Sequence, residues 1–237
     1  MSKQDSLDAL VIGAHPDDAE MAIGGIVAAM SAAGRRIMIV TLTAGEAGSW
    51  GSPEGRAREA AEAARILGCE HRILDFKDTG VENDRESRVR IAQLLRELRP
   101  TLVLAPYPDN RASHLDGRAN VDHLAAGLLA RDGCKLARLR KALPQGEPHQ
   151  VKRLFYYMLP ETVHPSFVVD VSEHEETLTR AIQAYASQMP IGRGPQSILD
   201  ILLAQRRAMG SRLHVGMAEA LLSEDALGGT VETLFSI

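Results

Sequence analysis

The sequence predicts a Rossmann-like α/β fold, in which a doubly wound and mostly parallel sheet carries helices on both faces. Short runs rich in Val and Ile alternate with longer amphipathic stretches, which is the pattern of successive βαβ units. The runs are apolar throughout, as expected of strands that are buried on both faces. No linker divides the 237 residues, of which 45% are hydrophobic, so we predict a single domain over 1–237.

The elements expected in the first half of the chain follow a regular alternation. The apolar run 7–14 stops before a proline and predicts a buried strand. Residues 18–33 have helical spacing, and Gly34 follows them as a C-terminal cap. By the same criteria we expect strands at 35–42, 69–76 and 101–105, and helices at 56–67 and 87–98.

The second half is less regular. A polar, turn-rich segment at about 109–120 indicates a loop insertion. We expect a helical region over about 173–237. The apolar stretch 218–222 (AEALL) within it could pack either between subunits or within the core of the chain. The expected elements are helices at 121–130, 173–188 and 198–209, and strands at 151–158 and 167–171.

Composition excludes several classes of function. The formal net charge of −4, with both signs interspersed, gives no electrostatic reason to bind nucleic acid or an anionic membrane. Aromatic residues make up only 4%, too few for a base-stacking surface. Neither Cys69 nor Cys134 belongs to a Cys-x-x-Cys pair. Without a signal peptide or an apolar run of about 18 residues, we expect a soluble cytoplasmic protein.

Polar side chains follow the first strand at the point where the strand ends. His15, Asp17 and Asp18 lie there, Glu46 follows the second strand, and Asp109 the fourth. In open α/β sheets ligands bind beyond the carboxyl ends of the strands, so these loops converge on one rim. Histidine and aspartate suit Zn²⁺, and a second carboxylate beside the metal can deprotonate water. The alternative is that the Asp-Asp pair only caps the following helix.

These residues belong to a longer pattern. The segment 14–20 (AHPDDAE), with two glycines at 24–25, resembles the signature of the LmbE-like, or PIG-L, N-acetylglucosaminyl deacetylases. The similarity continues at 42–49 (LTAGEAGS), 105–107 (APY) and 154–157 (LFYY). The chain length and the later segments resemble the bacillithiol-biosynthesis branch, whose members deacetylate N-acetylglucosaminyl malate.

The resemblance implies roles for individual residues. His15 and Asp18 would bind Zn²⁺, or Fe²⁺ in its place, and Asp17 would be the general base that activates water. Glu46 and Arg56 would face the substrate, a small N-acetylated sugar conjugate. The family also implies a homo-oligomer, either a trimer or a hexamer.

The family's third zinc ligand is the last histidine of a His-x-Asp-His motif, which this chain has altered. One imperfect version, 114–117 (HLDG), lacks the final histidine, and the other, 120–123 (NVDH), lacks the first. We prefer the second, because it keeps His123 as the ligand. Asp122 then joins Asp17 among the catalytic residues. Asn120 stands where the family has a substrate-facing histidine, and His114 is either a substitute for that histidine or an exposed loop residue.

Two rival functions follow from the altered motif and the fold class. One is a weakly active, metal-dependent sugar-binding homologue, and a related alternative is a deacetylase of another N-acetyl sugar. The other rival is a nucleotide-binding protein. We disfavour it because the turn after the first strand carries His15-Pro16-Asp17-Asp18 and not a glycine-rich phosphate loop.

Overall fold

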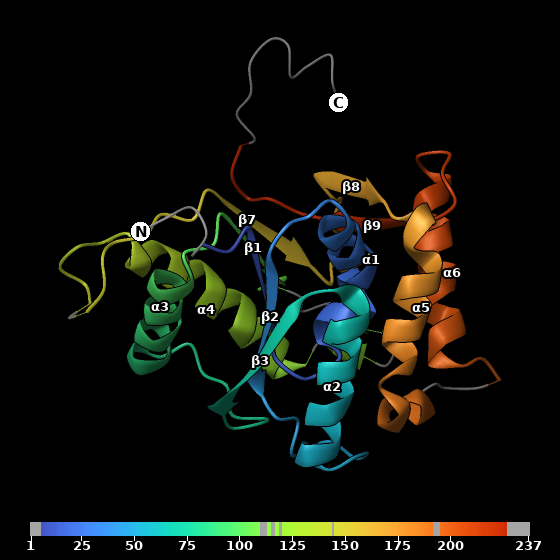
Figure 1. Ribbon diagram of the computed structural model, residues 1–237, viewed down its shortest axis with the longest axis horizontal. Coiled ribbons are helices and arrows are strands. Elements are labelled where there is room, and N and C mark those ends of the chain that lie inside the picture. The colour runs from blue at the N-terminus through green and yellow to red at the C-terminus, as the bar shows by residue number, and fades with distance from the viewer. Residues whose placement is uncertain are drawn as a thin grey trace, which may run out of the picture.

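The computed structural model describes residues 6–109, 113–114, 117–118, 120–143, 145–191 and 195–226. A layer containing α3 and α4 lies on one side of the central sheet, and α1, α2, α5 and α6 lie on the other (Figure 1). The strands are β1 (Ala9–Gly13), β2 (Ile37–Thr43), β3 (Glu70–Phe76), β4 (Leu102–Pro106), β5 (Ser113–His114), β6 (Gly117–Arg118), β7 (Arg153–Tyr157), β8 (Phe167–Asp170) and β9 (Ala218–Leu221). The helices are α1 (Asp18–Ala32), α2 (Pro53–Leu67), α3 (Arg85–Leu98), α4 (Val121–Ala137), α5 (Glu175–Gln183) and α6 (Ile198–Ser211), with short 3₁₀ turns η2 (Ser172–His174) and η3 (Ala186–Ile191).

The central sheet has five parallel strands in the order β3-β2-β1-β4-β7. From β1 the chain adds β2 and β3 on one side of the sheet and then β4 and β7 on the other side. The order of the strands therefore reverses at β1. In such sheets the crevice for a ligand opens where the order reverses, at the carboxyl ends of the central strands. The doubly wound, Rossmann-like prediction is confirmed, and the turn after β1 lies at this position.

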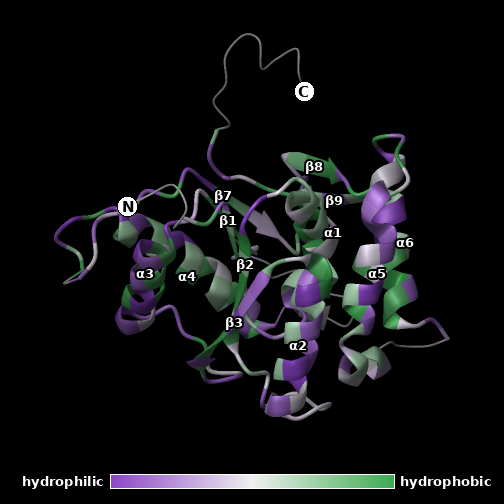
Figure 2. Ribbon diagram, viewed as in Figure 1, coloured by the Kyte–Doolittle hydropathy of each residue, from purple (hydrophilic) through white to green (hydrophobic). Residues whose placement is uncertain are grey.

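Both faces of the sheet are covered by apolar side chains. Leu10 and Ile12 of β1 pack into the cluster shared with α3 and α4, while Ala9 and Val11 pack into the cluster shared with α1 and α5. This alternation explains why the strand reads as a continuous apolar run. Figure 2 shows hydrophobic colour along β2 and hydrophilic colour on much of β3, which is the edge strand.

The expected boundaries differ from the structure mainly in the second half. The helix expected at 121–130 continues to residue 137, and the one expected at 173–188 is divided into η2, α5 and η3. Asp170 Oδ1 accepts the Ser172 N–H at 2.9 Å, and this local turn delays the start of α5. Pro190 lies inside η3, where it cannot donate a helical hydrogen bond.

The C-terminal region is not helical throughout, contrary to expectation. Residues 218–221 form β9, which pairs antiparallel with β8. Met217, Ala218 and Leu221 are buried, so this stretch packs within the chain, the second of the two expected alternatives. No helix in the part of the chain that the structure describes is long and apolar enough to cross a bilayer.

Strand β9 also carries a buried carboxylate that holds α1. Glu219, 3% exposed, accepts the N–H groups of Gly25 and Ile26 at 3.0 and 2.7 Å. Ile23 interrupts the helical backbone of α1 just before these donors, so they are the freed N–H groups of a restarted helix. Arg206 Nε donates to Glu219 Oε1 at 2.7 Å and completes a buried ion pair.

We therefore expect Glu219→Ala to lower the free energy of unfolding by about 3–5 kcal/mol, because it leaves a buried guanidinium without its counter-charge. Urea unfolding measures the loss. Glu175→Ala is the control: it removes an exposed partner of Arg207, and we expect a change of about 1 kcal/mol or less. Equal losses in the two variants would contradict the structural role of Glu219.

Candidate metal centre and catalytic site

The turn between β1 and α1 is organised around the Asp18 carboxylate. Asp18 Oδ2 accepts the N–H groups of Ala14 and His15 at 2.9 and 2.8 Å. Asp18 is also the first residue of α1, where the helix dipole favours a negative charge. At the end of β2, Thr43 donates its N–H and its hydroxyl to the Ala14 carbonyl at 2.9 and 3.0 Å. The two strand ends are therefore fixed together beneath the site.

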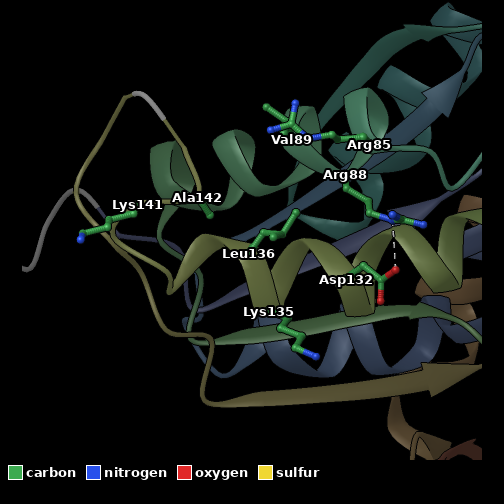
Figure 3. Close-up of a pocket in the computed structure, with 8 residues that line it drawn as sticks. All are labelled: Arg85, Arg88, Val89, Asp132, Lys135, Leu136, Lys141 and Ala142. Atoms are coloured by element: carbon green, nitrogen blue, oxygen red, sulfur yellow. Dashed lines mark ion pairs between the residues drawn. The ribbon is translucent and has the colours of Figure 1, made fainter.

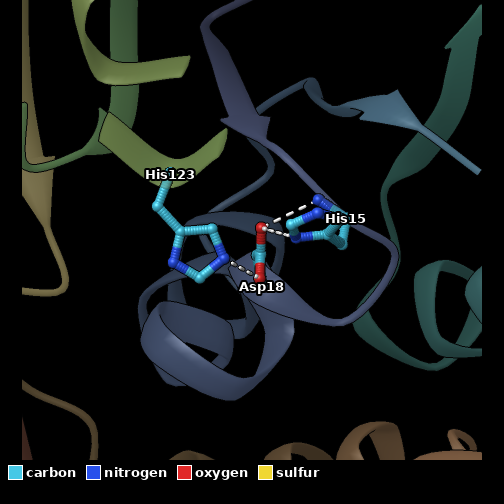
Figure 4. A group of neighbouring side chains, drawn as sticks. All are labelled: His15, Asp18 and His123. Carbon is cyan, nitrogen blue, oxygen red and sulfur yellow. Dashed lines mark hydrogen bonds and ion pairs between the residues drawn. The ribbon is translucent and has the colours of Figure 1, made fainter. Parts of the chain in front are cut away.

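Asp18 lies between two histidines from distant parts of the chain (Figure 4). His123 Nε2 is 3.0 Å from Asp18 Oδ1, and His15 Nδ1 is 3.6 Å from Asp18 Oδ2. One ligand atom from each of the three residues falls within 4.8 Å of the others. Two imidazoles and a carboxylate are a donor set that suits a catalytic zinc ion with an open position. The residues present therefore fit a metal.

Charges in this cluster shift its pKa values in opposite directions. Burial tends to lower the pKa of His15, but contacts with Asp18 and the charges of Asp78 and Asp17 raise it to about 9. Burial tends to raise the pKa of Asp18, but His123 and His15 hold it well below its usual range. The carboxylate between the histidines is therefore ionised.

Asp17 has the opposite electrostatic environment. Burial and the charge of Asp18 raise the pKa of Asp17 well above its usual value, and the guanidinium of Arg56 opposes this rise. Its backbone has a φ of 113°, a region that aspartate and asparagine enter more readily than other residues with a side chain. A carboxyl group with a raised pKa beside a metal site is suited to accept and return a proton.

Arg56, to which the resemblance assigned a substrate-facing role, is bonded to the turn that carries Asp17. It is 4% exposed. Its Nη2 donates to the Pro16 carbonyl at 2.6 Å and lies 3.4 Å from Asp17 Oδ2, and its Nη1 donates to the Gly45 carbonyl at 3.1 Å. These contacts make Arg56 the ion-pair partner of Asp17 and attach its guanidinium to the backbone on either side.

The second motif, residues 120–123 at the start of α4, contacts the first motif, residues 15–18. Asp122 is fully buried, and its Oδ2 lies 3.3 Å from His15 Nε2. Asn120 caps α4, with its side-chain oxygen accepting the Asp122 N–H at 2.8 Å. The structure thus brings Asp122 and His123 to His15 and Asp18. The side chain of His114 and residues 115–116 lie outside the described part of the chain.

Glu46 is exposed on the loop after β2, and its Oε1 accepts the N–H of Asp78 at 3.0 Å. Asp78 also contacts the site, and it was not among the site residues predicted from the sequence. Its Oδ1 lies 3.0 Å from His15 Nε2. The criterion that selected Glu46, a polar residue just after a strand, also applies to Asp78, which follows β3 by two positions.

A cavity of about 550 Å³ lies elsewhere, between α3 and α4 (Figure 3). Arg85, Arg88, Lys135 and Lys141 line it, and Arg88 Nε forms an ion pair with Asp132 at 3.2 Å. None of its lining residues belongs to the cluster around Asp18, and the candidate functional site is chosen on the chemistry of the two histidines and the carboxylates.

Comparison with known proteins identifies the family of this chain. The family model described as PIG-L, GlcNAc-PI de-N-acetylase, matches residues 10–133, which include both motifs. Diacetylchitobiose deacetylase of Thermococcus kodakarensis is 33% identical over 76% of this chain and 70% of its own length. A 1D-myo-inositol 2-acetamido-2-deoxy-α-D-glucopyranoside deacetylase of Catenulispora acidiphila is 28% identical over 71% of this chain, which spans only 61% of that relative.

Solved structures extend the similarity to almost the whole chain. The conserved protein TT1542 of Thermus thermophilus is 40% identical, with a TM-score of 0.85 over 95% of this chain and 98% of that one. GalB, a 4-carboxy-2-hydroxymuconate hydratase of Pseudomonas putida, shares the fold at a TM-score of 0.80 over 94% and 98% of the two chains, with only 22% identity. The family match and the 33% identical relative together show that this chain belongs to the PIG-L family of de-N-acetylases and is an amidohydrolase.

Proposed function

We propose that this enzyme hydrolyses the acetamide of an N-acetylglucosaminyl conjugate with a bound Zn²⁺, and that N-acetylglucosaminyl malate of bacillithiol biosynthesis is its substrate. The observation that carries the reaction class is the placement of Asp17 next to the His15, Asp18 and His123 cluster, close enough to interact electrostatically with Asp18 and His15. Relatives named for deacetylation of diacetylchitobiose and of an inositol glucosaminide support an N-acetylglucosamine unit in the substrate. The malate portion follows from the resemblance to the bacillithiol branch.

His15, Asp18 and His123 would hold the metal, which when bound supplies Lewis acidity toward the acetamide carbonyl and makes water more acidic. The Asp17 carboxylate removes a proton from the attacking water and returns it to the leaving amine. Arg56 stabilises the ionised form of Asp17 before the attack, since the guanidinium lies 3.4 Å away. Asn120 supplies at most a hydrogen bond where the family has a histidine, so Asp17 acts as both base and acid.

The coupling of Arg56 to Asp17 gives a prediction at Gly45. A Cβ at Gly45 would lie 2.0 Å from Arg56 Nη1, and the backbone there has a φ of +67°. We expect Gly45→Ala to displace the guanidinium from Asp17 and to lower kcat by up to about 10²-fold, as small misplacements of catalytic groups do. Steady-state rates of acetate release measure the effect.

Gly34→Ala is the matched control, because Gly34 has a φ of +74° but no atom within 4 Å of an added Cβ. It imposes the same kind of backbone strain, about 1–2 kcal/mol, without touching Arg56. Unfolding in urea should show the loss from backbone strain in both variants and a further loss in Gly45→Ala from the displaced guanidinium, while only Gly45→Ala loses activity. A normal kcat in Gly45→Ala would contradict the role given to Arg56.

The substrate is tested by comparing kcat/KM for N-acetylglucosaminyl malate, di-N-acetylchitobiose and the N-acetylglucosaminyl inositol. We expect the malate conjugate to be preferred, and a preference for either of the others would transfer the assignment to that conjugate. The binding-protein alternative is tested on the same compounds by isothermal titration alongside amine release. A trimeric or hexameric assembly and a cytoplasmic location remain predictions, and sedimentation of the purified protein tests the first.

A further inference from the structure

Asp78 is a buried carboxylate that neither sequence motif contains. It lies in the loop after β3, 63 residues from His15 in the chain, and its Oδ1 is 3.0 Å from His15 Nε2. Its side chain is only 5% exposed. Such a group needs specific partners, because burying an unpaired charge is costly.

The contact at Nε2 determines which nitrogen of His15 is left for a metal. Asp122 Oδ2 also approaches Nε2, at 3.3 Å, so two carboxylate oxygens converge on this one nitrogen. When His15 binds a metal as a neutral imidazole, Nε2 is therefore the ring nitrogen suited to keep its proton and donate it to these carboxylates. Nδ1, 3.6 Å from Asp18 Oδ2, is the nitrogen that faces the cluster, and it supplies the lone pair that a ligand requires.

The two carboxylates that hold His15 are themselves held differently. Asp122 is fully buried and accepts the backbone N–H groups of Thr79 and Val81 at 2.6 and 3.2 Å. Asp78 instead has its second oxygen, Oδ2, occupied by the N–H of Ala47 at 2.8 Å. Asp122 is fixed by the segment 79–81, whereas Asp78 is attached to the loop 44–52 between β2 and α2.

A second bond ties Asp78 to the same loop. The N–H of Asp78 donates to Glu46 Oε1 at 3.0 Å, so both its backbone and its carboxylate are bonded to neighbouring loop residues. Trp50, the only tryptophan of the chain, lies on this loop and is 50% exposed. A continuous path of hydrogen bonds therefore runs from His15 through Asp78 to the loop.

We propose that Asp78 is a positioning residue that couples the loop 44–52 to the metal ligand His15. One oxygen orients the imidazole, and the other keeps the loop against the site. Metal binding at His15 is then communicated to the loop, and a substrate that contacts the loop in turn steadies the ligand. The inference rests on the proposed metal-binding role of His15.

The test is a Zn²⁺ titration of the metal-free protein read out in two ways. A fluorescent chelator in competition reports affinity, and Trp50 emission reports the loop. We expect wild-type protein to bind Zn²⁺ with a change in Trp50 emission. We expect Asp78→Asn, which cannot accept from both His15 and Ala47, to bind about 10–100-fold more weakly and to lose the emission change.

Asp75→Asn is the matched control, since Asp75 lies three residues earlier, is exposed and pairs with Arg90. It should keep both the affinity and the emission change. Thermal unfolding of the metal-free proteins checks the fold, and Asp78→Ala serves if Asp78→Asn does not fold. Either an unchanged affinity or a retained emission change in the Asp78 variant overturns the coupling. A wild-type protein that binds no Zn²⁺ overturns the metal site itself, together with this inference.

Discussion

Replacing Asp17 by Asn is expected to lower kcat by about 10²–10⁴-fold, the range that a positioned general base contributes. Asparagine has nearly the same shape and tolerates the positive φ of 113° at this position, so the backbone of the turn should be retained. It cannot accept a proton at neutral pH. The measurement is the single-turnover rate of acetate release from the metal-loaded enzyme.

The same variant should retain its metal, because Asp17 is not among the residues proposed as ligands. Metal content by atomic emission should therefore equal that of the wild type. Asp8→Asn, at the opposite end of β1, is the control and should leave both kcat and metal content unchanged. A variant at Asp17 that keeps full activity would refute its assignment as the base.

Replacing His123 by Ala is expected to lower Zn²⁺ affinity by more than about 10²-fold. Loss of an outer partner of a metal ligand already costs about 10–100-fold, and His123 is one of only three ligands proposed. Activity should fall with the metal content. His123 Nε2 lies 3.0 Å from Asp18 Oδ1, so the change also removes a charge partner from a buried carboxylate. Chelator competition measures the affinity.

The informative comparison is His114→Ala, which tests the other imperfect version of the motif, residues 114–117 (HLDG). We expect it to retain Zn²⁺ affinity, with an effect confined to KM or kcat if His114 approaches the substrate. Should His114→Ala lose the metal and His123→Ala keep it, the third ligand would have been assigned to the wrong motif.

The sequence allowed the sheet and the first motif to be predicted for clear physical reasons. Each strand of the parallel core is covered on both faces, so it reads as a compact apolar run, as in β1 and β2. His15, Asp17 and Asp18 are close in sequence and follow a strand end, so their proximity in space is local. The location of a site there follows from topology alone.

Contacts between distant segments could not be predicted in the same way. Asp78 is one acidic residue among many in the sequence, and the role proposed for it rests on contacts with His15 and with Ala47 that only the fold brings about. Arg56 stands in the first turn of α2, and nothing in its sequence spacing predicts that its side chain is buried. It is buried because the carbonyl groups of Pro16 and Gly45 provide acceptors for its guanidinium.

The C-terminal strand shows a similar ambiguity. The stretch 218–222 consists of alanine, glutamate and leucine, which are all good helix formers. It becomes a strand because β8 offers an unpaired edge and because the Glu219 carboxylate is needed inside, between α1 and Arg206. Tertiary contacts therefore overrode local propensity.

The most direct test of deacetylation is to quantify acetate and free amine in one reaction of the zinc-loaded enzyme with N-acetylglucosaminyl malate. Proton NMR resolves both products and the remaining substrate. Hydrolysis predicts equal amounts of acetate and amine, formed by the wild type and almost absent with Asp17→Asn. Binding of the conjugate without release of acetate would contradict the proposed function and favour a sugar-binding protein built on the same fold.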